Sequence, residues 1–322
     1  MRARTRALRF AGVLGAIAVF AAAQLAPAAG AWGGRYSTST GESVNVTASD
    51  RYPVDENVTR AWAEFLTSLV HGPELARVTL HLAPPSEVQS LCGFDALGCY
   101  SDTRELIVAP QDDYPSGLTA QAVVTHEYGH HVARNRLNAP WNTTNYGTKR
   151  WASLMGVCAR ADAGTLFPGG SGFRYRLDPG EGFAESYRLM NELRAGRPES
   201  PWQVVDTSLR PDGQALAALE QDILNPWTGP VVQTRSGTFR AARGKATRSF
   251  SVATPLDGTL RLRLAASSKL RLRLTLYDPG RKLILATGGR QLSALICGQR
   301  SLAVRVTRQA GAGTFRLSIS KP

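Results

Sequence analysis

The segment VVTHEYGHHV, residues 123–132, holds three of the five histidines in this 322-residue chain. Within it, His126, Glu127 and His130 match the pattern HExxH. Residues four positions apart lie on one face of a helix, so the two imidazoles could bind one zinc ion together. Zinc lowers the pKa of a bound water to near 7, and the glutamate beside the first histidine could act as general base. The spacing therefore predicts one zinc ion per chain.

The other histidines are not predicted to bind the metal. His131 points about 100° away round the helix, while His71 falls in a helix-ending turn and His81 in a strand. No histidine follows His131 in the sequence. The third ligand should therefore be a carboxylate on a later element.

Glu181 and Glu185 in the segment EGFAESYRLM lie four positions apart, on one face of a second predicted helix. One could bind zinc while the other holds a histidine ring from behind. The stretch Asp178-Pro-Gly-Glu181 also matches a capping box, in which Glu181 would only bond the start of the helix. The residues by themselves leave these roles open.

The segments HEYGHHV and EGFAESYRLM together resemble the gluzincin metallopeptidases, most closely the catalytic domain of anthrax lethal factor and its relatives. The resemblance covers the stretch from one predicted helix to the other. It implies a zincin-like fold in which His126, His130 and Glu181 bind zinc, Glu127 is the base and Glu185 supports a ligand.

The same resemblance implies a tyrosine shortly before the third ligand that bonds the developing oxyanion. Here Tyr175, in FRYRLDPGEG, takes that place. By analogy with the family, the strand RELIVAP, residues 104–110, is expected to be the sheet edge to which a protein or peptide substrate adds.

The elements around these motifs alternate between helices and short strands. Hydrophobic spacing predicts helices, in chain order, over residues 54–70, 116–137, 178–196 and 212–224. Ser116 or Thr119 could cap the second of these helices, and Asp178 the third. Strands are expected over 76–84 and 104–110, with a leading strand or a loose arm over 33–50.

Beyond residues 225–230 the sequence alternates apolar and polar residues, with arginines at many polar positions. This period predicts five to eight strands of a small antiparallel sandwich of about 90 residues, and it resembles the pre-peptidase C-terminal modules of secreted bacterial peptidases. From Val231 to the end there are 18 Lys and Arg residues but only two acidic ones. An anionic cell-surface polymer is therefore a candidate partner, whereas no nucleic-acid motif is present.

The chain begins with four arginines, an apolar run and small residues, which predicts a secretory signal peptide. No later run is apolar enough to span a membrane. The four cysteines, an even number in an exported chain, predict two disulfides. A Cys92–Cys99 pair would leave Cys158 for Cys297, although three pairings are possible for four cysteines.

We therefore expect a signal peptide over residues 1–31, an α+β zinc metallopeptidase domain over 32–229 and a basic all-β sandwich over 230–322. The expected function is that of a secreted zinc metallopeptidase. The alternative is an exported, non-catalytic protein that binds a wall polymer or another polyanion and has a structural or vestigial zinc site. A cell-wall amidase with the same metal chemistry is a third possibility.

Overall fold

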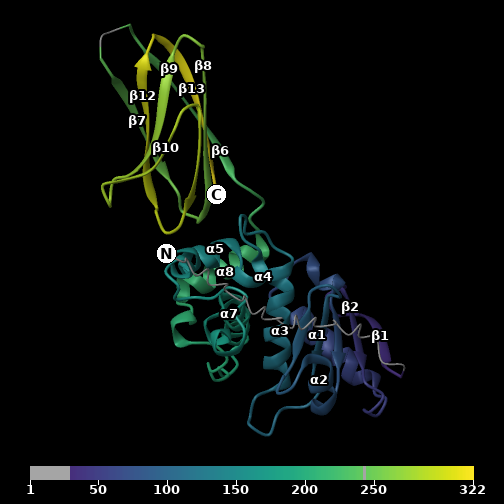
Figure 1. Ribbon diagram of the computed structural model, residues 1–322. Coiled ribbons are helices and arrows are strands. Elements are labelled where there is room, and N and C mark those ends of the chain that lie inside the picture. The colour runs from purple at the N-terminus through teal and green to yellow at the C-terminus, as the bar shows by residue number, and fades with distance from the viewer. Residues whose placement is uncertain (1–29, 242–243) are drawn as a thin grey trace, which may run out of the picture.

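The computed structural model of the protein describes residues 30–241 and 244–322. Almost all of the predicted signal peptide, residues 1–31, lies outside the described residues. An N-terminal α+β region with a mixed sheet precedes a C-terminal region of two antiparallel sheets (Figure 1). The predicted change from α+β to all-β structure is thus confirmed. No helix within the described ranges is both long and apolar enough to cross a membrane.

The N-terminal region contains one five-stranded sheet with strand order β1-β2-β3-β5-β4. The parallel strands β2, β3 and β5 form its centre, and β1 and β4 run antiparallel to their neighbours at the two edges. The segment expected to be a leading strand or a loose arm is the β1–β2 hairpin. The strands are β1 (Trp32–Ser37), β2 (Ser43–Ala48), β3 (Thr79–Leu82), β4 (Cys99–Ser101) and β5 (Leu106–Ala109).

The prediction that residues 104–110 form the sheet edge is wrong. They contain β5, which pairs with β3 on one side and with β4 on the other. The edge is β4, three residues that a tight turn folds back against β5. A strand this short has too few residues to display alternation, so sequence periodicity could not detect it.

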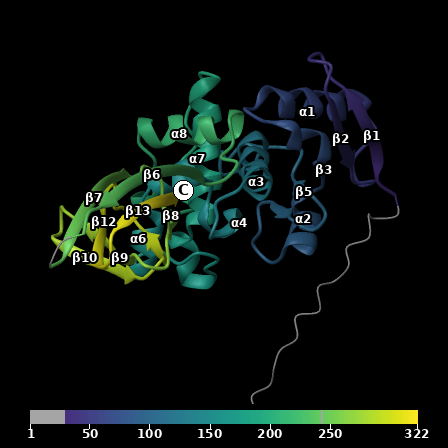
Figure 2. The ribbon, with the colours of Figure 1, turned by 90° about the horizontal axis from the view of Figure 1, so that it is seen from above.

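The four predicted helices are all present, as α1 (Glu56–Ser68), α3 (Ala120–Arg134), α7 (Pro179–Arg194) and α8 (Gly213–Leu224). Thr119 caps α3 by accepting a hydrogen bond from the backbone N of Ala122 at 3.1 Å. Short helices were not predicted: α2 (Pro85–Cys92), α4 (Thr143–Tyr146), α5 (Lys149–Leu154), α6 (Val157–Asp162), η1 (Pro73–Arg77), η2 (Gly172–Leu177) and η3 (Thr207–Leu209). α3 lies between the sheet and α7 (Figure 2).

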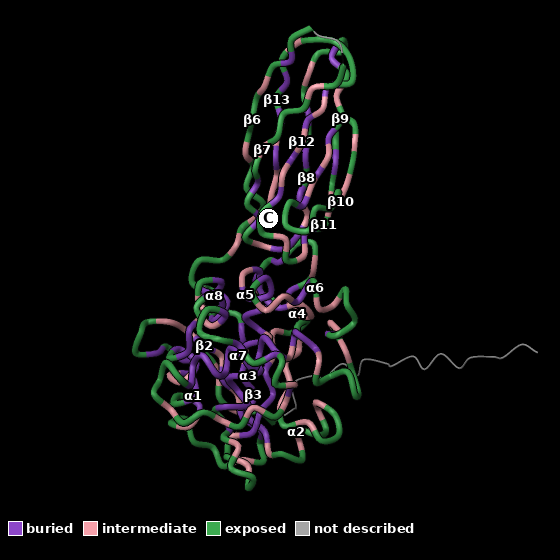
Figure 3. Tube along the Cα trace, turned by 90° about the vertical axis from the view of Figure 1, so that its left-hand side faces the viewer, coloured by how far each residue is buried: buried purple, intermediate pink, exposed green. Residues whose placement is uncertain are grey.

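The C-terminal region consists of two four-stranded antiparallel sheets, with strand orders β10-β9-β12-β7 and β11-β8-β13-β6. Alternate leucines, valines and isoleucines of both sheets are buried between them, and the residues between these face outward (Figure 3). The strands are β6 (Val231–Phe239), β7 (Ala246–Ala253), β8 (Gly258–Ala266), β9 (Arg271–Asp278), β10 (Leu283–Gly288), β11 (Gln291–Ile296), β12 (Ser301–Ala310) and β13 (Gly313–Lys321).

The two regions are joined covalently and by polar contacts. The structure contains two disulfides, as predicted: Cys92–Cys99 closes a loop before β4, and Cys158–Cys297 links α6 to the loop after β11. Ser153 of α5 accepts a hydrogen bond from the backbone N of Asp257 at 2.9 Å through its hydroxyl. Its carbonyl accepts one from Arg300 at 2.7 Å. These contacts hold the β region against α5 and α6.

Lys149, at the start of α5, is buried beside this junction. Its Nζ donates a hydrogen bond to the carbonyl of Ala139 at 2.7 Å and lies 4.6 Å from the ring centroid of Trp227. Burial lowers the pKa of Lys149 to about 8, against the opposing effect of Asp257 and Asp222. The protein therefore contains a lysine whose charge is costly in the folded state.

We expect this lysine to make stability depend on alkaline pH. Because its pKa is lower in the folded chain, the unfolded chain binds more protons between about pH 8 and pH 10, and the free energy of unfolding rises with pH. Relative to Lys149→Met, wild-type stability should increase by about 2 kcal/mol from pH 7.5 to 10 in denaturant titrations. Substitution of the exposed Lys269 by Met should not change the pH dependence of the free energy of unfolding from that of the wild type. If the difference in the free energy of unfolding between wild type and Lys149→Met is the same at every pH, the lowered pKa of Lys149 is not the cause.

Candidate metal centre

Two neighbouring helices carry the predicted metal ligands. His126 and His130 lie one turn apart on α3, and their ring centroids are 5.1 Å apart. Glu181 lies in the first turn of α7, whose N-cap Asp178 accepts a hydrogen bond from the backbone N of Gly180 at 2.8 Å. The cap is thus formed by Asp178, and the carboxylate of Glu181 points at α3 rather than at the start of its own helix.

The three side chains converge on one point. Glu181 Oε2 lies 3.3 Å from Nε2 of His126 and 3.4 Å from Nε2 of His130. One donor atom from each residue fits within 4.8 Å of the other two. Two imidazole nitrogens and one carboxylate oxygen are a donor set used by divalent metals such as zinc. This triad could therefore hold a metal ion.

Glu185, one turn beyond Glu181, holds the first histidine from behind. Its Oε2 lies 3.0 Å from Nδ1 of His126, and its two oxygens accept hydrogen bonds from Arg188 at 2.7 and 3.0 Å. Arg188 is in turn paired with Glu192. In the neutral ring with Nδ1 donating to Glu185, the lone pair of Nε2 of His126 faces Glu181 and His130.

The two carboxylates of the triad region favour positive charge on the imidazoles between them. Burial alone would lower the pKa of His126, but hydrogen bonds with Glu181 and Glu185 raise it to about 10. Burial would raise the pKa of Glu185, but its bonds with His126 and Arg188 hold it at about 2. The two imidazoles likewise hold the pKa of Glu181 well below its usual range, against the effect of burial. Two ionised carboxylates thus face a pair of imidazoles.

Glu127 and Tyr175 lie beside this triad. Glu127 is buried and lines the cleft, its carboxylate makes no hydrogen bond within the described residues, and burial raises its pKa. The hydroxyl of Tyr175 donates a hydrogen bond to Glu181 Oε2 at 2.7 Å, and the residue is 39% exposed. Both residues therefore lie where a substrate beside the metal site could reach them.

The remaining histidines have structural partners. His131 is fully buried, with Nδ1 3.0 Å from the hydroxyl of Tyr100 in β4 and Nε2 2.9 Å from the carbonyl of Glu74. It connects the edge strand to α3 and is not part of the triad. His71 lies against the carbonyl of Gly72, and His81 against Thr47 and Glu87.

A cleft of about 890 Å³ opens beside the triad. One wall is the loop closed by Cys92–Cys99, in which Phe94 is 91% exposed, together with the first half of α3. The lining also includes Ser171, Gly172 and Tyr175, with residues 201, 203 and 204. The sequence indicated this loop only through its cysteines. Its place in the cleft, like the role of Arg188, depends on contacts between distant segments.

No family model matches the chain, and no curated protein matches it. Among solved structures, the Yersinia pseudotuberculosis-derived mitogen (YPM) is 13% identical, with a TM-score of 0.24 over 29% of this chain and 87% of that one. PliG of Aeromonas hydrophila, a periplasmic inhibitor of g-type lysozyme, is 13% identical, with a TM-score of 0.23 over 29% of this chain and 85% of that one. Both likenesses lie in the C-terminal β region. At these TM-scores they carry no argument about the metal triad.

The triad depends on a close approach of α3 to α7 at Gly129. A Cβ placed on Gly129 would lie 2.8 Å from Cα and 3.2 Å from the carbonyl oxygen of Ala184. Both are backbone atoms, which cannot move aside as a flexible side chain can. The glycine in HEYGH therefore sets the distance between the two ligand-bearing helices.

We expect Gly129→Ala to separate the helices and weaken metal binding. Such overpacking typically costs about 1–3 kcal/mol of stability, and Glu181 would move away from the histidines. Zinc titration and thermal unfolding measure both effects. Gly213→Ala in α8, where a Cβ would meet no atom within 4 Å, is the matched control and should behave as wild type. Unchanged zinc affinity in Gly129→Ala would show that the spacing tolerates a methyl group.

Glu185→Gln should lower zinc affinity by about 10–100-fold, because the amide supports the ring of His126 less well than a carboxylate does. Competition with a chromogenic chelator measures the change. Glu192→Gln serves as control, since Glu192 bonds the same arginine but not the histidine. Equal losses in the two variants would assign the effect to Arg188 rather than to support of His126.

Proposed function

We propose that the protein is an exported zinc-dependent metallopeptidase whose metal is held by His126, His130 and Glu181. The observation that carries the proposal is the convergence of these three donors beside a cleft that also contains Glu127. Glu181 lies 51 and 55 positions after the two histidines, on a different helix. The resemblance of both segments to the gluzincins supports the same assignment. The two disulfides fit a protein that leaves the cytosol.

The residues present fit zinc. The donor set is two imidazole nitrogens, which bind a metal in their deprotonated form, and one carboxylate. Glu185 supports the ring of one ligand from outside the set, as is usual for zinc-binding histidines. Structural zinc sites have four protein ligands, whereas catalytic sites have three and leave one position open. Among the described residues only three His, Cys, Asp or Glu side chains converge here. This count favours the enzyme over the non-catalytic alternative with a structural zinc.

When bound, zinc would polarise the scissile carbonyl and acidify the water that attacks it. Glu127 accepts a proton from that water and delivers it to the leaving amine. Tyr175, whose side chain lines the cleft, offers a hydroxyl to the charge that develops on the carbonyl oxygen. Glu185, itself bonded by Arg188, holds the ring of His126 in place.

The substrate is a protein or peptide in this proposal. Gly98, which lines the cleft, immediately precedes the edge strand β4, and no strand within the described residues pairs with the outer side of β4. An extended peptide could therefore pair with β4, while its scissile bond lies over the metal. This replaces residues 104–110 as the expected substrate strand.

Glu127→Gln tests the proposal. The variant should still bind one zinc per chain, but casein hydrolysis should fall by about 100-fold or more, because proton transfer by a positioned base contributes that much. Metal analysis of the purified protein and a casein assay measure the two properties. The exposed Glu56→Gln variant should behave as wild type in both.

A chelator completes the same experiment. It should abolish hydrolysis by the wild type, and added zinc should restore it. Wild-type hydrolysis by Glu127→Gln would refute the assigned base. Zinc binding with no hydrolysis of any protein substrate by the wild type would favour the non-catalytic alternative.

A further inference from the structure

The positive charge of the C-terminal region is not neutralised within it. Its two acidic residues are both buried. Asp257 accepts hydrogen bonds from the backbone N of Gly298 and from Arg300, and Asp278 accepts two backbone N–H groups of the following turn. Neither carboxylate reaches the outer face of a sheet. The 18 Lys and Arg residues from Val231 onward therefore have few internal counterions.

Three exposed arginines form a row on the outer face of the sheet β11-β8-β13-β6. Arg261 and Arg263 are two positions apart on β8. The next outward position of β8 is Ala265, and Arg316 of the neighbouring strand β13 is its register partner, so Arg316 continues the row. Two residues of a strand span about 7 Å, so the row advances in steps of that length. Within the described residues, none of the three makes a hydrogen bond or an ion pair. Their fork-shaped donors are thus free for a ligand.

The neighbours of this row are hydroxyl and amide side chains. The strand registers place on the same face Thr234 and Ser236 of β6, Gln291 and Ser293 of β11, and Ser318 and Ser320 of β13. These four strands carry no acidic residue, and their only aromatic residues, Phe239 and Phe315, are buried in the sandwich. The face therefore lacks the rings on which bases stack. Arginine forks among hydroxyl groups suit anionic groups joined by a hydroxylated backbone.

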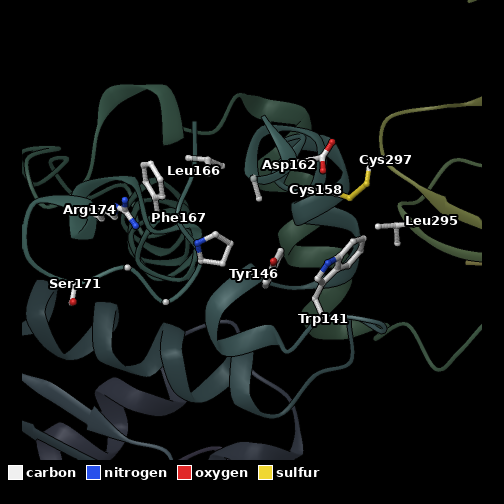
Figure 4. A pocket seen from close by; sticks show the side chains of 14 residues that line it. Trp141, Tyr146, Cys158, Asp162, Leu166, Phe167, Ser171, Arg174, Leu295 and Cys297 are labelled. Carbon is white, nitrogen blue, oxygen red and sulfur yellow. A yellow bond between two sulfur atoms is a disulfide. The ribbon is translucent and has the colours of Figure 1, made fainter. Parts of the chain in front are cut away.

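The row also leads toward the N-terminal region. Leu295, which pairs with Thr259 two positions before Arg261, lines a groove of about 630 Å³ between the two regions. Figure 4 shows this groove, with Leu295 and Cys297 on one side and Trp141 on the other. Ser171 lines both this groove and the metal cleft. A polymer held on the arginine row would therefore lie close to the cleft.

We propose that Arg261, Arg263 and Arg316 form a binding surface for a linear polyanion with a hydroxylated repeat, such as a poly(polyol phosphate) or an acidic polysaccharide. The surface would keep the protein on an anionic polymer. This inference concerns binding and is independent of the metallopeptidase proposal.

The opposite sheet supplies a matched control. Its outer face also carries three arginines, Arg271, Arg273 and Arg305. There Arg305 lies over the ring of Tyr277, 3.7 Å from its centroid, so one of the three guanidinium groups is already engaged. The two faces thus have equal formal charge but differ in the arginines left free.

The test compares Arg261→Thr/Arg263→Thr/Arg316→Thr with Arg271→Thr/Arg273→Thr/Arg305→Thr in the full zinc-loaded chain. Binding to poly(glycerol phosphate) and to polygalacturonate is measured from 50 to 200 mM salt. The first variant should bind about tenfold or more weakly than wild type. The slope of a plot of log K against log salt concentration should become less negative by about 2, as expected for the loss of three charge contacts. The second should remain near wild type. Unchanged thermal unfolding and zinc content establish that both variants fold.

The two polymers identify whether the anion is a phosphodiester or a carboxylate, and loss of binding to either one in the first variant alone supports the proposal. Equal losses in both variants would mean diffuse attraction by net charge and would overturn it. Tighter binding to duplex DNA or to anionic lipid vesicles than to both polymers would also overturn it.

Discussion

The contact of Gly129 with the backbone of Ala184 is the constraint on which the rest of the candidate site depends. It brings α3 and α7 closer than any side chain at position 129 would allow. Only at that distance does Glu181, in the first turn of one helix, reach two imidazoles on the other. The same contact places Glu185 behind His126. The convergence of the three side chains and the support of His126 therefore rest on one helix–helix packing distance.

Around this contact, charges are arranged as a buried chain. Glu192, Arg188 and Glu185 pair in turn along α7, and Glu185 continues the chain to His126. Burying ions is costly unless each has a partner, and a chain of alternating charge meets that requirement. The buried arginine thus keeps Glu185 ionised, which fixes the tautomer and the orientation of His126. His126 of the triad, with Glu127 and Tyr175, lines the cleft.

The β region adds a second surface to this arrangement without contributing to the triad. A disulfide and the contacts of Ser153 connect it to α5 and α6, beside the buried Lys149. The charged lysine is destabilising where it stands, and Asp222 and Asp257 only partly offset the effect of burial on its pKa. The groove beside this junction contains Leu295, whose strand partner Thr259 lies two positions before Arg261, and Ser171, which also lines the cleft. The groove therefore lies between the two proposed binding surfaces.

The sequence alone determined the elements whose periodicity is long or whose residue types are distinctive. The four longer helices, the change to alternating strands, the two disulfides and the HExxH pair could all be predicted, because each depends on residues near one another in the chain or on composition. Short helices and the three-residue strand β4 contain too few residues to display a period. The choice of Glu181 to face the histidines, with Glu185 behind, could not be derived from spacing. Both glutamates lie on the same face of α7, and only the packing of that helix against Gly129 decided which carboxylate would meet the metal side.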